Sequence, residues 1–472
     1  MPGPDRLLTP DLCVIGAGSG GLSVAAGAAQ LGASVVLIEG AEIGGDCLNF
    51  GCVPSKALIA AAHAAQALRA GGPGLPPRDP QPDFPAAMAH VRAAVAAIAP
   101  HDSQERFAGM GVTVIREWAG FASPTEVRAG PYRIRARRFV IATGSQAKIP
   151  RLPGLAAVPY LTNETVFALT ACPEHLLVLG GGPVGCELAQ AFHRLGARVT
   201  LIQRHRLLPR EDAEAAALVR DRLQAEGIDV LEMASVTQVG PGPILALSNG
   251  ETRRGSHLLV ATGRAPALDR LNLPAAEIDF TPQGITTDAR LRTTNPRVFA
   301  IGDAAGMEQF TQVAAYHAGL VVRQALFGLP VRLRRDHLTR ATFTDPELAQ
   351  VGPTEAEARA AHGPALTVAR ADFGRNDRAI TEAATTGFVK VMVVKGRVIG
   401  ATVVGPGAGE LIAPWSLAVA SRLKMARMAS LITAYPTRAD LTRAVVSAYY
   451  SPRLFANPWL KRFVSVVQRV LP

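Results

Sequence analysis

The chain has 472 residues, more than one hydrophobic core usually serves, so two to four domains are expected. Hydrophobic residues make up 48% and charged residues 18%, which is typical of a globular protein and excludes a disordered one. The net charge of +11 is carried mostly by scattered arginines, and no nucleic-acid motif accompanies them. A polyanionic cofactor is therefore favoured over nucleic acid as the binding partner.

The five cysteines are an odd number and too few for a secreted disulfide framework. The first residues lack the pattern of a secretory signal, and no run approaches the roughly 20 apolar residues of a membrane-spanning helix. We therefore expect a protein of the reducing cytoplasm.

Residues 11–39 carry the first motif. A strand is predicted at Asp11–Ile15, a helix at Leu22–Leu31 and a second strand at Ser34–Ile38, with a glycine-rich turn after the first strand. This is the βαβ fingerprint of a dinucleotide-binding fold, in which glycines permit a tight turn, close approach to the pyrophosphate and helix–strand packing, and a terminal acid binds a ribose hydroxyl. The residues predicted for these tasks are Gly16, Gly18, Gly21 and Glu39.

The stretch GGDCLNFGCVPSKAL, residues 44–58, places Cys47 and Cys52 five positions apart. A zinc site is disfavoured, because it usually needs four ligands and no second pair has matching spacing. Cysteines close to a dinucleotide site are expected to react, which favours a redox pair over an inert one. Because the thiolate is the working form, a local positive field should lower the pKa of both thiols.

The fingerprint recurs at residues 175–202, with a strand at His175–Leu179, a helix ending at Leu195 and a strand at Arg198–Ile202. Two such motifs imply two dinucleotides, with hydride transfer between them as the simplest explanation. The corresponding glycines are Gly180, Gly182 and Gly185.

The second motif ends without an acid. Gln203 stands at that position, and Arg204, His205, Arg206 and Arg210 follow it. A carboxylate would repel a 2′-phosphate, whereas arginine pairs with it. The sequence therefore favours NADPH over NADH, with Gln203, Arg204 and Arg210 as candidate contacts; a solvated basic loop is the alternative.

The cysteine segment resembles the active-site segment of the flavin-dependent pyridine nucleotide–disulfide oxidoreductases, a family that includes dihydrolipoamide dehydrogenase, glutathione reductase and mercuric reductase. Other family landmarks follow in order along nearly the whole chain. They are Ala142-Thr143-Gly144-Ser145, Ala261-Thr262-Gly263-Arg264, Ile301-Gly302-Asp303 and Phe343-Thr344-Asp345-Pro346-Glu347. The resemblance implies an α/β protein with two Rossmann-like nucleotide-binding domains and a C-terminal α+β dimerisation domain.

The resemblance also implies residue roles. FAD binds the first fingerprint, NADPH binds the second, and Cys47 and Cys52 form the redox disulfide between FAD and an acceptor. Cys52 is the flavin-proximal thiol, Cys47 is the interchange thiol, and Lys56 pairs with Glu187 near the reactive edge of the flavin. The cofactor contacts added in this way are Gly45, Asp46, Lys56, Thr143, Gly144, Gly263, Gly302 and Asp303.

One motif departs from the family. Disulfide-reducing relatives carry a C-terminal His-Pro-Thr-x-x-Glu segment that supplies acid–base chemistry to the partner subunit, whereas this chain has Tyr435 and Asp440 at those positions. A tyrosine, with a pKa near 10, is a poor general base beside a histidine near 6.5. Efficient turnover of glutathione or dihydrolipoamide is therefore not expected, and Tyr435 as a plain interface residue is the alternative.

Tyrosine at this position, and the stretch 374–380, resemble mercuric reductase. That enzyme also delivers its metal through a C-terminal cysteine pair, and this chain has no cysteine after Cys186. Reduction of mercury is therefore a less favoured alternative, and no resident metal site is predicted.

A helix is predicted to begin at Pro458 at the end of the chain. Apolar and basic residues separate onto two faces of it, and no acidic residue follows Asp440. A helix packed on the dimer is favoured, and a helix lying on an anionic membrane is the alternative. The apolar face comprises Trp459, Leu460, Phe463, Val467, Val470 and Leu471, and the polar face comprises Lys461, Arg462, Gln468 and Arg469.

Four segments are expected: an FAD-binding domain at 1–152, an NAD(P)H-binding domain at 153–270, a central segment at 271–337 that completes the FAD site, and a dimerisation domain at 338–472. The favoured function is a homodimeric oxidoreductase passing electrons from NADPH through FAD and the cysteine pair to an unidentified acceptor. The alternatives are reduction of a quinone or a metal ion, and a membrane-docked redox sensor with little turnover.

Overall fold

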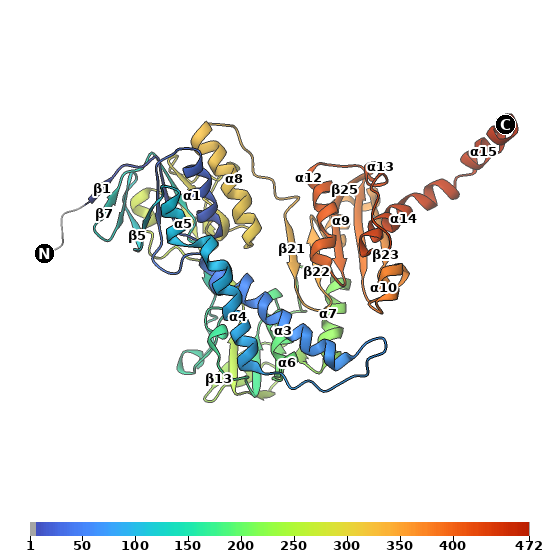
Figure 1. Cartoon of the computed structure of the whole chain (residues 1–472), viewed down its shortest axis with the longest axis horizontal. Coiled ribbons are helices and arrows are strands. Elements are labelled where there is room, and N and C mark those ends of the chain that lie inside the picture. Colours follow the sequence, from blue (N-terminus) through green and yellow to red (C-terminus); the bar gives the residue numbers. More distant parts are fainter. Residues whose placement is uncertain (1–5, 472) are drawn as a thin grey trace. The chain divides into compact units, whose positions relative to one another are not determined.

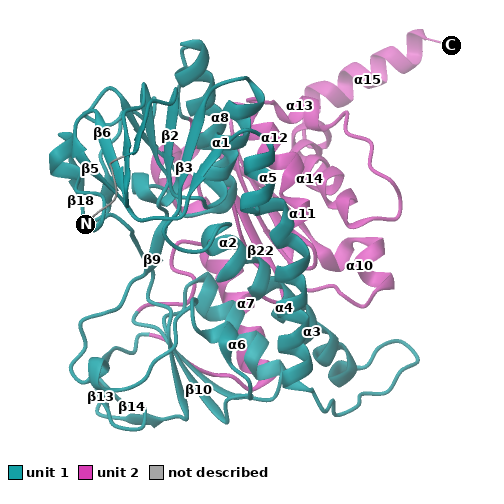
Figure 2. Ribbon diagram, turned by 60° about the vertical axis from the view of Figure 1, so that its left-hand side comes forward, with its two compact units in different colours: residues 1–204, 233–333 teal, residues 205–232, 334–472 magenta. Residues whose placement is uncertain are grey.

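The computed structural model describes residues 6–471, and its internal contacts divide the chain into two compact units. Unit 1 comprises the chain up to residue 204 together with residues 233–333, and unit 2 comprises residues 205–232 and 334–472 (Figure 2).

A parallel five-stranded sheet, in the order β20-β8-β2-β3-β4, forms the first nucleotide fold of unit 1. Its alternate residues face opposite sides, as a strand's period of two requires. Leu12 and Val14 pack into one core beneath helices, whereas Cys13 and Ile15 pack into another against a second sheet. The strands are β2 (Leu12–Ile15), β3 (Val35–Ile38), β4 (Thr113–Ile115), β8 (Arg138–Ile141) and β20 (Val298–Ala300).

Three helices cover one face of this sheet, and α1 and α8 lie side by side on it (Figure 1). They are α1 (Ser19–Gln30), α5 (Gln104–Gly109) and α8 (Thr311–Phe327). An antiparallel sheet covers the other face, with strands β1 (Arg6–Leu8), β5 (Ala119–Ser123), β6 (Glu126–Ala129) and β7 (Tyr132–Ile134), of which β1 pairs in parallel with β7. Two short antiparallel pairs complete this part: β9 (Ser145–Ala147) with β17 (Arg264–Pro266), and β18 (Phe280–Thr281) with β19 (Gly284–Ile285).

The second nucleotide fold of unit 1 has β10 at its centre, paired in parallel with β11 and β16. The helix α3 packs against both α4 and α6, and Figure 1 shows the three together. The elements of this fold are β10 (His175–Leu179), α6 (Pro183–Arg194), β11 (Arg198–Ile202) and β16 (His257–Val260), with an antiparallel sheet of β13 (Val236–Gly240), β14 (Ile244–Leu247) and β15 (Thr252–Arg254). The helices α2 (Gly45–Asn49), α3 (Cys52–Ala70) and α4 (Phe84–Ile98) come before it in the chain.

Unit 2 is built on an antiparallel five-stranded sheet in the order β21-β22-β25-β24-β23. Its core surrounds the fully buried Trp415, between the sheet and the helices α12 and α14. The strands of this sheet are β21 (Thr339–Thr342), β22 (Leu348–Val351), β23 (Leu366–Asp372), β24 (Phe388–Val394) and β25 (Arg397–Val404). The short strand β12 (Asp229–Leu231) also falls within the residues of unit 2 but is not part of this sheet. The helices are α7 (Ala213–Glu226), α9 (Glu355–His362), α10 (Asp377–Thr381), α11 (Ala408–Leu411), α12 (Ala413–Ala420), α13 (Met425–Met428), α14 (Leu441–Phe455) and α15 (Pro458–Val470).

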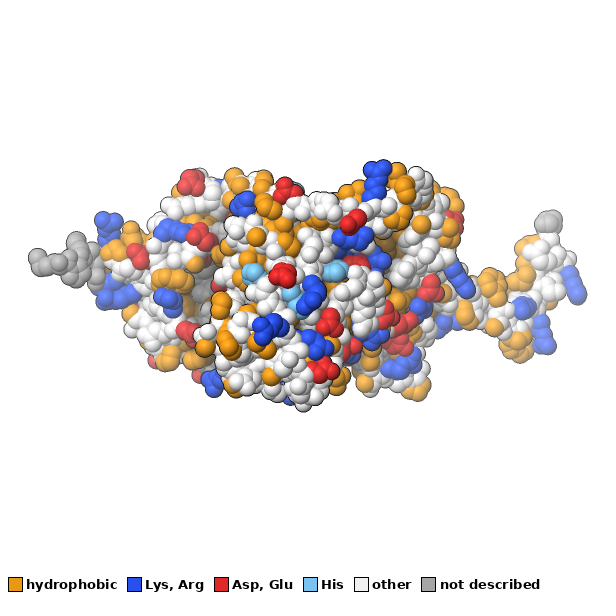
Figure 3. All heavy atoms as spheres, turned by 90° about the horizontal axis from the view of Figure 1, so that it is seen from below, with side chains coloured by type: hydrophobic (Ala, Val, Ile, Leu, Met, Phe, Trp, Pro, Cys, Tyr) orange, Lys and Arg blue, Asp and Glu red, His pale blue; other side chains and the backbone are white. Residues whose placement is uncertain are grey.

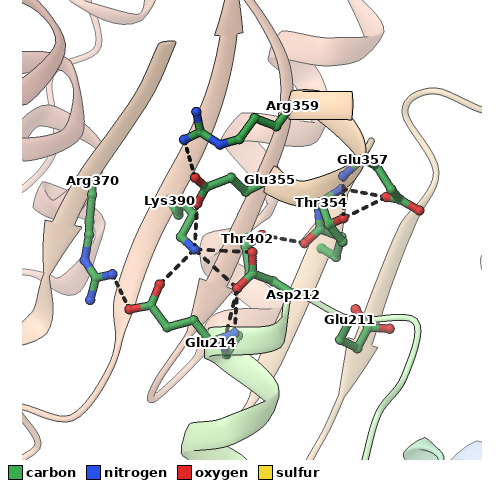
Figure 4. Close-up of polar contacts among 12 residues, drawn as sticks. Glu211, Asp212, Glu214, Thr354, Glu355, Glu357, Arg359, Arg370, Lys390 and Thr402 are labelled. Atoms are coloured by element: carbon green, nitrogen blue, oxygen red, sulfur yellow. Dashed lines mark hydrogen bonds and ion pairs between the residues drawn. The ribbon is translucent and has the colours of Figure 1, made fainter. Parts of the chain in front are cut away.

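A buried ionic cluster joins α7 to the sheet of unit 2 (Figure 4). The ammonium of Lys390, on β24, lies 2.8 Å from Glu214 of α7, 3.0 Å from Glu355 of α9 and 3.3 Å from Asp212. Asp212 is itself buried and caps α7, because its carboxylate accepts the backbone N–H groups of residues 214 and 215. Figure 4 also shows Arg370 on β23 reaching Glu214. Lys390 thus links the start of α7, which is distant in sequence, to the sheet.

The predicted fold class, with two Rossmann-like folds and a separate C-terminal domain, is confirmed. The strands predicted at His175–Leu179 and Arg198–Ile202 match β10 and β11 residue for residue. The first helix begins at Ser19 rather than Leu22, because the glycines of the turn already belong to its first turn. The four-segment division stays a prediction, and it includes six residues, 1–5 and 472, outside the described range.

Among the described helices, none is long and apolar enough to cross a membrane.

Candidate active site

Three helices of unit 1 begin around the cysteine pair. Cys52 is the first residue of α3, Ser19 is the first of α1 and Thr311 is the first of α8. The sulfur of Cys52 lies 3.3 Å from the hydroxyl of Thr311, and Cys47, on α2, hydrogen-bonds to Cys52, Thr311 and Ser19. Three helix N-termini therefore lie at the two sulfurs. Each N-terminus carries partial positive charge, which favours a thiolate there.

The surroundings shift the pKa values of the two thiols in opposite directions. The pKa of Cys52 falls to about 6, chiefly because the thiol of Cys47 donates a hydrogen bond to it; burial opposes the shift, and Thr311 and the charge of Lys56 add to it. The pKa of Cys47 is raised, first by the same hydrogen bond and then by burial and by the neighbouring negative charge. The expectation of two lowered pKa values is therefore wrong for Cys47, because a second thiolate beside the first is disfavoured.

This asymmetry predicts the alkylation behaviour of the reduced protein. With a pKa of about 6, Cys52 is mostly thiolate from about pH 7 upward, so its alkylation rate should plateau there, whereas an ordinary cysteine still gains rate up to its pKa near 9. Lys56→Met removes a cation that stabilises the thiolate and should move the midpoint to higher pH. Iodoacetamide labelling of the reduced holoprotein, with peptide mapping at each pH, measures both. A midpoint that stays unchanged in Lys56→Met would contradict the account.

Lys56 follows Cys52 by one helical turn and therefore lies on the same face of α3. Its ammonium lies 2.8 Å from the carboxylate of Glu187, which is buried on α6 of the second nucleotide fold. The ion pair implied by the resemblance is thus present, and it connects the cysteine helix to the second fingerprint. Its action beside a flavin stays a prediction.

The sequence motifs did not indicate Arg264 as a site residue, although it ends one of the family landmarks. Its guanidinium donates to the hydroxyl of Ser145 at 2.7 Å and to the backbone oxygen of Ser145 at 2.8 Å, and it lies 3.0 Å from Asp46. Ser145 in turn donates to Asp303, whose pKa is raised because burial outweighs the hydrogen bond and the charge of Arg264. Asn163 donates to Asp46 at 2.8 Å. Three separate landmarks therefore meet through one arginine.

The first fingerprint fits a dinucleotide. Gly16 has a φ of +103°, and a Cβ there would lie 2.4 Å from the backbone oxygen of Ala142, so only glycine serves this turn. A Cβ at Gly18 would have no neighbour nearer than 3.9 Å, which leaves room for a phosphate beside the start of α1. Thr143 offers a buried hydroxyl that has no hydrogen-bond partner among the described residues. These features fit FAD, the dinucleotide implied for this motif.

The carboxylate of Glu39 already accepts hydrogen bonds from two nearby backbone N–H groups. One carboxylate oxygen accepts the N–H of residue 17 at 2.7 Å, and the other accepts the N–H of residue 41 at 2.8 Å. The carboxylate thus stands at the end of β3 with its orientation fixed, and each oxygen keeps capacity for a further donor.

The second fingerprint repeats this geometry. Gly180 has a φ of +115° and lies against Ala261, whereas a Cβ at Gly182 would meet no described atom within 4 Å. Gln203 takes the place of Glu39, because its side-chain oxygen accepts the N–H of Gly181 at 3.0 Å. Arg204 follows in unit 1 and is exposed.

Arg206 and Arg210, which follow the predicted 2′-phosphate contact Arg204, lie in unit 2 and make different hydrogen bonds. Arg206 donates to the backbone oxygens of Pro209 and Glu211, at 3.2 and 2.9 Å, so it braces its own loop. Arg210 is exposed, and its backbone oxygen accepts a hydrogen bond from Arg340.

Tyr435 and Asp440 have different partners in unit 2. The hydroxyl of Tyr435, a residue that is 69% exposed, donates to Asp377 of α10 at 2.7 Å. Asp440 accepts from Thr433 at 3.1 Å and forms an ion pair with Arg443 at 3.0 Å. Asp377 also raises the pKa of Tyr435, so the phenol remains protonated and serves as a donor, and Asp377 is a partner that the sequence motif did not indicate.

No group of three or more His, Cys, Asp or Glu side chains in residues 6–471 is arranged to hold a metal ion.

Comparison with known proteins places this site in a family. The family model described as pyridine nucleotide-disulphide oxidoreductase matches residues 10–318, and the model of the corresponding dimerisation domain matches residues 338–445, which supports a homodimer. Mercuric reductase of Streptomyces lividans is 36% identical over 457 residues, covering 93% of this chain and 96% of the relative. Dihydrolipoyl dehydrogenase of Bacillus subtilis (strain 168) is 30% identical over 444 residues, covering 91% of this chain and 96% of the relative.

Solved structures agree. The HOCl-induced flavoprotein disulfide reductase RclA of Escherichia coli, solved as a Cu(II) complex, matches with a TM-score of 0.82 and 28% identity, over 92% of this chain and 99% of that one. LpdA of Mycobacterium tuberculosis matches with a TM-score of 0.84 and 28% identity, over 92% of this chain and 98% of that one. The chain therefore belongs to the pyridine nucleotide-disulphide oxidoreductase family, whose members are enzymes that use FAD and NAD(P)H.

Proposed function

We propose that this enzyme uses NADPH and FAD to reduce the Cys47–Cys52 disulfide, and that the resulting dithiol reduces an external acceptor. The observation that carries the proposal is the position of Cys52 at the start of α3, with a pKa lowered to about 6 and with Lys56 one turn away, paired to the second nucleotide fold. FAD, when bound, supplies two-electron chemistry between NADPH and a disulfide. Its candidate ligands are the glycines of the first fingerprint, Thr143 and Asp303.

The dithiol needs no additional oxidant or reductant beyond NADPH and the acceptor. With an acceptor disulfide, the sulfur of Cys47 bonds to one acceptor sulfur, the acceptor S–S bond breaks, and the first thiol leaves. Cys52 then bonds to Cys47, releasing the second thiol and restoring the disulfide. Each cycle oxidises one NADPH, consumes one proton and reduces one disulfide to two thiols.

Proton transfer limits which acceptors are suitable. Cys47 holds a proton that it must lose before it attacks, and Tyr435, whose pKa is raised, is a poor base for taking it. Acceptors with acidic leaving thiols, or thiophilic metal ions that displace the proton on binding, place less demand on such a base. The expected substrates are therefore electron-poor disulfides or soft metal ions rather than glutathione disulfide or lipoamide.

A second candidate function is reduction of a quinone without use of the cysteines. It is supported by the same substitution, because Tyr435 stands where a histidine would serve disulfide reduction. The two are distinguished by testing whether NADPH alone opens the disulfide of the oxidised holoprotein, measured by alkylation of the freed cysteines.

The preference for NADPH is a separate prediction. Arg204→Gln should raise the KM for NADPH about tenfold or more and leave the KM for NADH within about twofold, because a charge-assisted hydrogen bond contributes roughly 1.5–3 kcal/mol. Steady-state NADPH and NADH oxidation with one acceptor measures it, and Arg254→Gln, at another exposed arginine, is the matched control. Equal changes for both nucleotides would show that Arg204 does not bind the 2′-phosphate.

A further inference from the structure

The C-terminal helix α15 is an appendage of unit 2 that neither family model reaches, because the dimerisation match ends at residue 445. The preceding helix α14 is anchored in the core through Val445, Val446 and Tyr449. None of the 13 residues of α15, all of them described, is buried. Figure 2 shows this helix extending from the end of α14, away from the rest of unit 2.

The sequence builds this helix locally. The side chain of Asn457 accepts the N–H groups of residues 459 and 460, and Pro458 stands at the first helical position, where it loses no hydrogen bond. The helix therefore begins at a defined residue without help from packing.

Its two faces are fully separated. At 3.6 residues per turn, the apolar residues cover a continuous arc of about 160°, and the polar residues occupy the remainder. Trp459 is 76% exposed, Phe463 64% and Val470 75%. Figure 3 shows hydrophobic and basic side chains together on this helix, at the right-hand end of the view. The apolar residues are Trp459, Leu460, Phe463, Val464, Val466, Val467 and Val470, and the polar ones are Lys461, Arg462, Ser465, Gln468 and Arg469.

The charges of α15 indicate what kind of surface could cover its apolar face. All three charged residues of α15 are basic, and no acidic residue follows Asp440. A second α15 would bring three like charges against three, so pairing of two copies is opposed in either orientation. The apolar arc is also wider than the narrow seam of a two-helix coiled coil. At 13 residues, the helix is too short to span a bilayer, which needs roughly 20.

We propose that α15 binds the surface of a membrane containing anionic phospholipids, with its apolar face in the headgroup region and its basic residues beside the phosphates. Trp459 at the start of the helix suits the interface, where one side of its ring is apolar and its N–H is hydrated. Such a contact goes beyond the redox chemistry and does not depend on it. It would bring the enzyme close to acceptors dissolved in, or attached to, the membrane.

The test is co-sedimentation of the intact holoprotein with vesicles of phosphatidylglycerol and phosphatidylcholine, and with vesicles of phosphatidylcholine alone. The expected result is binding to the anionic vesicles that weakens with salt, and little binding to the neutral ones. Lys461→Gln, Arg462→Gln and Arg469→Gln together should weaken binding about a hundredfold, at about fivefold for each basic residue near the surface. Trp459→Glu with Phe463→Glu should abolish it.

Matched controls separate this effect from general changes of charge or apolar surface. Arg116→Gln, Arg151→Gln and Arg254→Gln remove three exposed arginines elsewhere, and Leu75→Glu charges an exposed apolar residue elsewhere. Both should bind as the parent protein does, and all variants should retain its rate of NADPH oxidation. Absence of binding to anionic vesicles, or equal binding by the α15 variants, would overturn the proposal. Self-association beyond a dimer that Trp459→Glu abolishes, without lipid binding, would instead assign the face to a second copy.

Discussion

Cys47→Ser and Cys52→Ser should each lower NADPH-dependent reduction of a disulfide acceptor by about three orders of magnitude or more, as expected when a nucleophile is removed. A serine hydroxyl neither forms a disulfide nor ionises near neutral pH, so each variant breaks the pair. Cys52→Ser also removes the sulfur that carries the thiolate beside Thr311 and Lys56. The measurement is steady-state NADPH consumption with 5,5′-dithiobis(2-nitrobenzoate).

Cys172→Ser is the matched control, because Cys172 is partly exposed and its sulfur contacts only backbone oxygens among the contacts described for it. It should retain the parent rate. Quinone reduction should also survive in Cys47→Ser if electrons leave without using the cysteines. Disulfide reduction that persists in both active-site variants would remove the pair from the electron path.

Lys390→Met should destabilise unit 2 by about 3 kcal/mol or more, the cost of leaving a buried charge without its partner. The lysine is 5% exposed and faces the carboxylates of Asp212, Glu214 and Glu355, so its loss leaves the buried carboxylate of Asp212 uncompensated. Hydrogen exchange in α7 and β24, measured under native conditions, reports the free energy of opening without assuming that the whole chain unfolds in one step.

The control is Lys424→Met, at an exposed lysine of the same unit, which should change stability by less than about 0.5 kcal/mol. Adding Asp212→Asn to Lys390→Met should recover part of the loss, because it removes the buried negative charge that Lys390 balances, while the amide oxygen can still cap α7. A loss equal to that of Lys424→Met would mean that the cluster contributes nothing.

The pH dependence of this cluster follows from its pKa shifts. For Lys390, burial works to lower the pKa, but hydrogen bonds and the charges of the carboxylates outweigh it and raise the pKa above 10.5, so its contribution is complete below that pH and is lost as the pH rises further. For Glu214 and Glu355, burial works to raise the pKa, but Lys390 and the arginines outweigh it and lower the pKa below 4.5. Their contribution is present above that pH and is lost as the pH falls further.

Local signals in the sequence predicted much of the fold. The two fingerprints revealed both nucleotide folds, because the glycines, the strand and the helix of each lie within about 30 residues. Pro458 marked the start of α15 for the same reason, because proline's preference for the first helical position is a local signal. The separation of apolar from basic residues in α15 was equally visible.

The site was less predictable, because its contacts join distant positions. Cys52 and Thr311 are 259 residues apart, and Ser145 and Arg264 are 119 apart, so a single sequence gives no spacing that pairs them. The raised pKa of Cys47 depends on its hydrogen bond to Cys52 and on its burial, and the C-x4-C spacing alone indicates neither. The partner of Tyr435 is Asp377, which belongs to a helix outside the motif.

The central claim is that NADPH reduces the Cys47–Cys52 disulfide. We would titrate the oxidised holoprotein with NADPH under argon, follow its visible spectrum, and alkylate samples for peptide mapping at each step. The account predicts that both Cys47 and Cys52 change from a disulfide to free thiols as two electrons are added, with Cys52 alkylated faster because of its lower pKa, and that a long-wavelength thiolate-to-flavin absorption band accompanies the change. Bleaching of the flavin with both cysteines still protected from alkylation, or full alkylation of both before NADPH is added, would contradict it.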